Sequence, residues 1–230
     1  MDAEGMSRVE SALATIAHEL RTPLSAIASA AEMLTRYANE PSIVGIGEII
    51  SRQTATMRAL LEELLDVSRI DTGRLALRMC ALDLREVARN AVDDYRGQFD
   101  RAGLHCELTL YSQPITVNGD AVKLGQVLGN LLSNAINFTH APGSVHVVVE
   151  ASGDPACLDV RASGIGLSAE LLPVVFDRYR QEDRGGFGGL GLGLPIAKGL
   201  VELHGGEIRA FSDGRGKGCT IMVRLPLAIA

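Results

Sequence analysis

Residues 120–139 read DAVKLGQVLGNLLSNAINFT, an apolar helical pattern with two asparagines on another face. Asn130 and Asn134 are four residues apart, so a helix over 123–138 places them side by side. The opposite stripe supplies the core residues Leu124, Val127, Leu128, Leu131 and Ile136. Amide side chains coordinate Mg2+ and donate hydrogen bonds to phosphates, although paired asparagines are more often caps or surface contacts. The stretch predicts a core helix whose polar face suits a metal-bound triphosphate.

Two glycine-rich stretches follow this helix in the chain. Residues 160–168 read VRASGIGLS, where Gly164 and Gly166 allow a backbone to approach a ligand closely after a predicted strand. Residues 185–206 read GGFGGLGLGLPIAKGLVELHGG, with glycines at three alternating positions before a helix: Gly189, Gly191 and Gly193. Backbone N–H groups and a helix N-terminus at such a place suit phosphate. Glycine also serves ordinary turns, so it is the order of the three stretches that favours a nucleotide pocket.

The rest of the second part alternates between helix and strand patterns. Helices are predicted over 84–101, 123–138 and 190–204, and strands over 104–111, 145–151, 156–161, 207–211 and 219–225. Asp83 is the expected N-cap of the first of these helices. Such runs predict an α+β layer, with helices on one face of a mixed sheet. The character of the sequence changes after Asp71, which places a domain boundary within 71–80.

The first part of the chain carries two helical seams. The apolar positions of the first are Leu13, Ile16, Leu20, Leu24, Ile27, Ala31 and Leu34, and those of the second are Ile46, Ile50, Gln53, Met57, Leu60, Leu64 and Val67. The short stretch 38–42 between them predicts an antiparallel helical hairpin. A lone hairpin buries one stripe per helix, so two copies pairing as a four-helix bundle satisfy both seams. The alternative is that the hairpin packs on the rest of its own chain.

The first helix also carries a reactive type of side chain. Residues 16–24 read IAHELRTPL, and His18 lies two residues from the seam position Ile16, where we expect it to be exposed. The neighbouring Glu19 can hold one ring nitrogen and make the other more basic, which turns an imidazole into a nucleophile. Thr22 lies four residues further on the same face. Taken alone, a helical histidine beside a glutamate is usually an ordinary solvated surface pair.

Composition narrows the function classes. The 230 residues are 47% hydrophobic and carry a formal charge of −6, which supports a real core and argues against a nucleic-acid partner. Four cysteines lie far apart, without zinc or disulfide spacing, and indicate reduced core thiols in a cytoplasmic protein: Cys80, Cys106, Cys157 and Cys219. No apolar run reaches the roughly 18 residues of a membrane span, so this segment is expected to make no membrane contact. Nucleotide binding stays open.

Five motifs in one order resemble those of sensor histidine kinases of two-component signalling. IAHELRTPL looks like the H box, QVLGNLLSNAINFT the N box, SGIGL the G1 box, VVFDRYRQED the F box and GGLGLGLPIA the G2 box. The resemblance implies a dimeric four-helix bundle built from helical hairpins over 1–75, for dimerisation and phosphotransfer. A catalytic α/β sandwich of the Bergerat ATP-binding type over 76–230 follows from the same resemblance. It also implies ATP and Mg2+ as cofactors, a homodimer, and a response-regulator receiver domain as partner.

The resemblance also implies a role for each matching residue. His18 would be the phosphoacceptor, Glu19 its base, and Thr22 a residue that positions water for dephosphorylation of the regulator. Asn134 would be the principal Mg2+ ligand and Asn130 a phosphate-side contact. The first glycine pair, Gly164 and Gly166, would shape the adenine end, and the later three, Gly189, Gly191 and Gly193, would bind phosphates through their amides. Phe176 would pack under a lid, while Arg178 and Arg180 are candidates for phosphate contacts.

Three departures from the family pattern concern the nucleotide. Ala162 stands where the G1 box has an Asp that accepts the adenine amino group, and losing a charged acceptor costs about 1.5 to 3 kcal/mol. Asn137 stands where the N box commonly has a Lys, and the lid between Phe176 and Gly189 is short. Two functions follow: an active kinase, or a degenerate kinase that serves as a phosphotransfer or docking module. A Bergerat ATPase or chaperone without phosphotransfer is a third class, from which the histidine helix distinguishes this chain.

Overall fold

A computed structural model describes residues 20–32, 34, 43–151, 153, 155–179 and 190–228. The chain divides into two compact units, which are considered separately below. The first contains the described residues up to Ser68 together with 190–192, and the second contains 69–179 and 193–228. Within the described ranges, no helix is long and apolar enough to cross a membrane.

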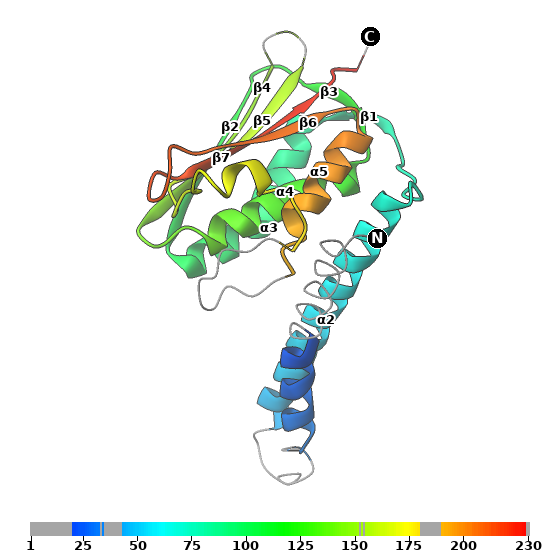
Figure 1. Ribbon diagram of the computed structural model, residues 1–230, viewed down its shortest axis with the longest axis vertical. Coiled ribbons are helices and arrows are strands. Elements are labelled where there is room, and N and C mark those ends of the chain that lie inside the picture. Colours follow the sequence, from blue (N-terminus) through cyan, green and yellow to red (C-terminus); the bar gives the residue numbers. More distant parts are fainter. Residues whose placement is uncertain are drawn as a thin grey trace. The chain divides into compact units, whose positions relative to one another are not determined.

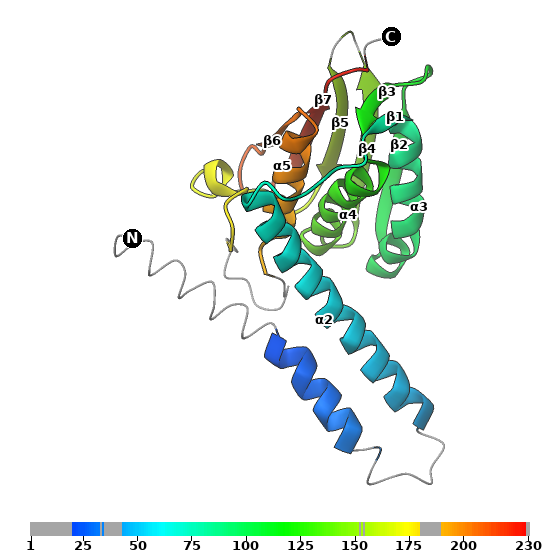
Figure 2. The ribbon, with the colours of Figure 1, turned by 90° about the vertical axis from the view of Figure 1, so that its right-hand side faces the viewer.

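The first unit is helical. Residues 20–32 and 34 are helical and lie beside α2 (Ile43–Asp71), whose last residues from Arg69 onward belong to the second unit (Figures 1 and 2). The predicted seam of α2 is confirmed, since Ile46, Leu60 and Val67 are buried and its other four positions are half-buried. The prediction fails at Leu24, which is 56% exposed.

Pro23 and Ala30 are the buried residues of the first helix, seven positions apart. The inward stripe is therefore made of smaller side chains and lies about one residue away from the predicted seam. This rotation turns Leu24 toward solvent in a single hairpin.

The second unit is built on a mixed five-stranded sheet. In the order of pairing, the strands are β2 (Leu104–Leu110), β4 (Gly143–Ala151), β5 (Ala156–Ala162), β7 (Cys219–Leu225) and β6 (Glu207–Phe211). The pair β2 and β4 is parallel, and each other neighbouring pair is antiparallel. A separate antiparallel pair joins β1 (Cys80–Asp83) and β3 (Thr116–Gly119).

Three helices cover one face of this sheet, namely α3 (Leu84–Ala102), α4 (Ala121–Asn137) and α5 (Gly193–Leu203) (Figures 1 and 2). A short 3-10 turn, η1 (Leu172–Val174), lies between β5 and α5 in the chain. Alternate strand residues such as Val145, Val147 and Val160 are buried on the helix side. The opposite face of the sheet carries more polar and exposed side chains, which is the pattern expected for a sheet covered on one side.

The helix ends follow local capping chemistry. The Asp83 side chain accepts a hydrogen bond from the Arg85 N–H at 3.1 Å, which confirms it as the N-cap of α3. Gly103 ends that helix with a φ of 66°, a conformation that favours glycine. The side-chain hydrogen bond from Arg85, with further backbone donors, lowers the pKa of Asp83 despite its burial.

A buried junction connects α4, α5 and the segment before β1. Asp120 caps α4, and its carboxylate also accepts a bond from the Arg78 N–H at 2.9 Å. The Asp120 N–H donates to His204 Nε2 at 3.0 Å, while His204 Nδ1 lies 2.7 Å from the Leu200 carbonyl oxygen. Burial raises the pKa of Asp120, but the backbone N–H donors outweigh it, so the pKa lies below its ordinary value.

The predicted elements of the second unit are present with small shifts of their ends. The differences are that α5 begins at Gly193 rather than at residue 190, and that Ile136 is half-buried while Leu132 and Ala135 are buried. The two short strands β1 and β3 were not predicted. All four cysteines are free, but the prediction of core thiols is wrong, because Cys80 is exposed and Cys106, Cys157 and Cys219 are half-buried.

Candidate functional site

The asparagine face of α4 meets the start of α5. Asn130 Nδ2 donates a hydrogen bond to the Gly193 carbonyl oxygen at 3.0 Å, across 63 positions of sequence. A Cβ added to Gly193 would lie 3.7 Å from the Asn130 side chain, so the two backbones approach closely. Asn134 and Asn137 are half-buried along the same helix. Of the predicted site residues on α4, Asn130 thus reaches the position where the last predicted phosphate glycine begins a helix, and Asn134 and Asn137 follow it along α4.

The Gly-x-Gly turn after β5 is fixed to the C-terminal end of α4. The Ile165 N–H donates to the Phe138 carbonyl oxygen at 2.9 Å. A Cβ added to Gly164 would lie 2.1 Å from that same oxygen, so no larger residue fits there. Gly166 has a φ of 68°, and an added Cβ would lie 2.1 Å from the Gly214 carbonyl oxygen. Both glycines are therefore required by backbone contacts, as well as being suited to a ligand.

Thr139 is a site residue that the sequence reasoning missed. Its side chain is 6% exposed, and its hydroxyl oxygen has no hydrogen-bond partner among the described residues. That oxygen would lie 2.8 Å from a Cβ added to Gly164, which places it at the Gly-x-Gly turn. An unpaired buried hydroxyl is uncommon and calls for a ligand or a water molecule. The orphaned hydroxyl thus fits a ligand with polar groups, and a threonine two residues after the last helical asparagine was the available signal.

Ala162 ends β5 on the helix-covered face of the sheet. It is half-buried and pairs with Val145 on one side and Cys219 on the other. Burial raises the pKa of the Cys219 thiol to about 11, so this part of the sheet disfavours ionised groups. Ala162 is half-buried beside Cys219, so a side chain at position 162 is partly shielded from water, and a hydrogen bond that it makes to a ligand is stronger than one in water.

Arg178 is engaged within the protein. Its guanidinium forms a two-pronged ion pair with the carboxylate of Asp71 in the last turn of α2. In the same turn, Ile70 lies against Gly199 of α5, where an added Cβ would be 2.7 Å from its methyl group. Arg178, a candidate for phosphate contact, is thus paired with a carboxylate in this structure, and its contact with phosphate stays a prediction. Its neighbour Tyr179 has a φ of 57°, which is strained for a non-glycine residue.

The remaining predicted site residues fall elsewhere. His18, Glu19, Gly189 and Arg180 lie outside the described residues. Thr22 is exposed on the helical segment 20–32 of the first unit. Gly191 belongs to the first unit and has a φ of 65°. Among the described side chains, no three His, Cys, Asp or Glu gather as a metal site.

Two family models match the chain. The model described as "Histidine kinase-, DNA gyrase B-, and HSP90-like ATPase" matches residues 119–229, which include α4, the Gly-x-Gly turn, Thr139 and α5. The model of the "His Kinase A (phospho-acceptor) domain" matches residues 8–73. The second match covers IAHELRTPL, and the first covers the asparagine helix and both glycine-rich stretches. The first model supports nucleotide binding by the second unit.

Known proteins agree with these matches. The circadian input-output histidine kinase CikA of Synechococcus elongatus is 34% identical over 93% of this chain, which spans 29% of the length of that relative. The structure of Acinetobacter baumannii histidine kinase AdeS matches with a TM-score of 0.73 at 24% identity, over 92% of this chain and 98% of that one. A structure of histidine kinase ThkA with response regulator protein TrrA matches with a TM-score of 0.70 at 21% identity, over 98% of this chain and 64% of that one. The structural likenesses show the fold, a helical hairpin followed by a Bergerat α/β sandwich.

Proposed function

The chain belongs to the sensor histidine kinases of two-component signalling, and we propose that it phosphorylates itself on His18 with ATP in the cytoplasm. The phosphoryl group then passes to an aspartate of a response-regulator receiver domain. The observation that carries the proposal is the convergence on α4, where Asn130 holds the start of α5 and the Gly164 turn is fixed beside the orphaned hydroxyl of Thr139. These contacts place the Gly-x-Gly turn and the start of α5, which are distant in sequence, against the asparagine helix α4.

The residues of the second unit have distinct roles in this proposal. The amide oxygen of Asn134 would hold Mg2+, which would offset the charge of the nucleotide phosphates, and Asn130 keeps the phosphate end of the pocket formed through its bond to Gly193. The backbone N–H groups of Gly189, Gly191 and Gly193 donate to phosphate oxygens at the start of a helix. At the other end, the Gly164 and Gly166 turn and the Thr139 hydroxyl receive the adenine.

In this proposal the first unit carries the residues that accept and transfer the phosphoryl group. The neutral imidazole of His18 attacks the γ-phosphorus, a nitrogen–phosphorus bond forms, and the bond to the bridging oxygen breaks as ADP leaves. Glu19 accepts the proton that the other ring nitrogen loses, so the product histidine is neutral on its ring. In the transfer to the regulator, a carboxylate oxygen of the aspartate bonds to phosphorus, the nitrogen–phosphorus bond breaks, and the imidazole takes a proton back. Thr22 positions the water that later removes the phosphoryl group from the aspartate.

Exposed leucines on the hairpin support a homodimer. Leu24, Leu61 and Leu65 are 56%, 49% and 52% exposed. Leu61 and Leu65 lie one turn apart on α2 and so form a continuous apolar strip. A second copy of the hairpin covers such a strip when two hairpins form a four-helix bundle.

A degenerate kinase is the second candidate function, and Ala162 is the observation that favours it. The methyl group offers no acceptor in a poorly hydrated part of the pocket. Asn137 removes a cation from the phosphate side, and the Asp71 carboxylate occupies Arg178. In this alternative, His18 receives its phosphoryl group from a partner kinase, or the hairpin serves to dock regulators.

The decisive experiment is incubation of the chain with ATP labelled in the γ-phosphate and Mg2+. We expect acid-labile, base-stable label that is absent from His18→Gln and that transfers to a receiver domain. His105→Gln is the matched control, because that histidine is exposed on β2, away from both units' motifs. Absence of label in the parent chain, together with label when an active histidine kinase is added, would establish the degenerate function. Nucleotide hydrolysis that survives His18→Gln without any label would indicate an ATPase.

A further inference from the structure

The uncovered face of the five-stranded sheet contains a hollow of about 390 Å3. This volume lies within the usual range for small-molecule sites, roughly 300 to 1,000 Å3. The hollow lies at the end of the sheet where β5 and β6 finish and β4 and β7 begin. The asparagines of α4 lie on the opposite face, and Ala162 at the end of β5 is the edge that the hollow shares with the proposed nucleotide pocket.

One row of side chains across four strands forms its floor. The register places His146 opposite Arg161, Arg161 opposite Thr220, and Thr220 opposite Phe211. Directly paired residues point to the same face, so all four side chains face the hollow. The row therefore offers, in order, an imidazole, a guanidinium, a hydroxyl and an aromatic ring.

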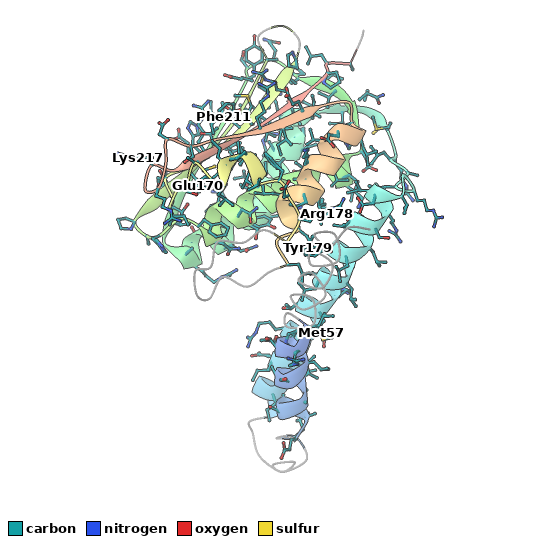
Figure 3. The ribbon with its side chains drawn as sticks, in the orientation of Figure 1. Met57, Glu170, Arg178, Tyr179, Phe211 and Lys217 are labelled. Carbon is teal, nitrogen blue, oxygen red and sulfur yellow. The ribbon has the colours of Figure 1, made fainter. Side chains whose placement is uncertain are left out.

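Cations and hydroxyls complete the lining. Lys217 extends from the β6–β7 loop, and Phe211 and Lys217 lie at the same end of the sheet (Figure 3). Ser163 Oγ accepts a bond from the Ser144 N–H at 2.8 Å, so its own proton is available to a ligand. Asp213 also lines the hollow. The lining thus carries two cations, Arg161 and Lys217, against the one carboxylate of Asp213, and the Asp159 carboxylate next to the lining is paired with Arg161.

Internal contacts hold these groups in place. Arg161 is oriented by a bond of 2.8 Å to the buried carboxylate of Asp159, and this bond leaves further guanidinium N–H groups for a ligand. The loop that carries Lys217 is fixed by Ser212, whose hydroxyl donates to the Gly218 carbonyl oxygen at 2.7 Å and accepts from the Leu167 N–H at 3.0 Å. A hollow whose walls are already ordered loses little conformational freedom when a ligand binds.

We propose that this hollow binds a small organic anion, whose phosphate or carboxylate group contacts Arg161 and Lys217 and whose flat apolar part lies on Phe211. Guanidinium and ammonium groups form their strongest hydrogen bonds with these anions. Phe211 is 47% exposed at the rim, where a ring can stack without displacing another side chain. The site would add a ligand input to the catalytic unit that is separate from ATP.

The test uses the full chain and phenyl phosphate as the probe, observed by saturation-transfer NMR of its ring protons. We expect a Kd of about 1 mM or lower, equivalent to roughly −4 kcal/mol. Competition by inorganic phosphate and by citrate identifies which anionic group the site prefers. Arg161→Gln and Lys217→Ala are each expected to weaken binding about tenfold, and Phe211→Ala to reduce the affinity for phenyl phosphate to that for inorganic phosphate.

Two control variants locate the binding. Arg209→Gln removes a guanidinium from the same face of the sheet but outside the hollow, and it should bind phenyl phosphate like the parent. Asn130→Ala changes the nucleotide side and should also leave this binding unchanged. The proposal is overturned if Arg161→Gln and Lys217→Ala, folded like the parent by circular dichroism, bind the probe equally well. It is also overturned if Asn130→Ala alone abolishes binding, because the probe then occupies the nucleotide pocket.

Discussion

Replacement of Ala162 by aspartate should restore tight nucleotide binding. The new carboxylate would project from the end of β5 on the helix side, between Val145 and Cys219 in the neighbouring strands. A hydrogen bond from the adenine amino group to a carboxylate is worth about 1.5 to 3 kcal/mol, which corresponds to a 10- to 100-fold lower Kd. Ala162→Asn presents a neutral oxygen of the same reach and should gain only about 0.5 to 1.5 kcal/mol, or 2- to 10-fold.

The same substitution should carry a cost in the free protein. The raised pKa of Cys219, about 11, indicates that the surroundings of position 162 disfavour charge. We therefore expect Ala162→Asp to lower the free energy of unfolding by about 1 to 3 kcal/mol without nucleotide, and to recover it with nucleotide bound.

Two measurements check this prediction, a titration with a fluorescent ATP analogue and Mg2+ and a urea unfolding curve with and without nucleotide. The reasoning would be refuted if folded Ala162→Asp bound nucleotide within threefold of the parent. It would also be refuted if Ala162→Asn matched the aspartate variant, since the charge would then contribute nothing.

Three further substitutions or treatments probe the second unit. Gly164→Ala places a Cβ 2.1 Å from a backbone carbonyl oxygen and should lower the free energy of unfolding by about 1 to 3 kcal/mol. The control is Gly125→Ala, where α4 has open space, and it should raise the free energy of unfolding by about 0.5 to 1 kcal/mol. Urea titrations measure both. Asp120→Asn should lower the free energy of unfolding by about 2 to 4 kcal/mol at pH 7. The pKa of Asp120 is lowered in the folded protein, so this contribution to stability is present above the ordinary pKa near 4 and disappears as the pH falls below it. Acid unfolding curves of the parent and the variant should therefore converge. A thiol reagent at pH 8 should modify the exposed Cys80 within minutes. It should modify Cys219 far more slowly, because burial raises the pKa of that thiol to about 11. Equal rates of modification in mass spectrometry would contradict the burial of Cys219.

Local signals predicted most of the second unit. Asp83 and the periodicity of residues 84–101 located α3 because capping and amphipathic spacing are properties of neighbouring residues. The strands β1 and β3 have four residues each, too few for an alternating pattern to be visible. The parallel pairing of β2 with β4 is likewise absent from the local pattern, because it depends on residues almost forty positions apart.

The site was predicted in part, and the misses have physical causes. The glycines at 164 and 166 were identified from their spacing, and the structure gives each a backbone contact that requires glycine. Thr139 was missed because a threonine after a helix usually caps or faces water, and its burial is set by the turn that packs on it. The ion pair of Arg178 with Asp71 was not predicted, because a side chain's partner cannot be read from its type and Asp71 lies 107 residues away.

The strand order of the catalytic unit has a consequence for its synthesis. β7, the last strand in the chain, lies between β5 and β6, so those two strands have no shared partner until Cys219–Leu225 has left the ribosome. Until then the sheet has open edges, which are prone to pair with other nascent chains. We therefore expect this unit to complete its folding only after Cys219–Leu225 has emerged from the ribosome. A premature stop before Cys219 should produce an aggregation-prone fragment, even though α2 to α5 and both glycine-rich stretches are present in it.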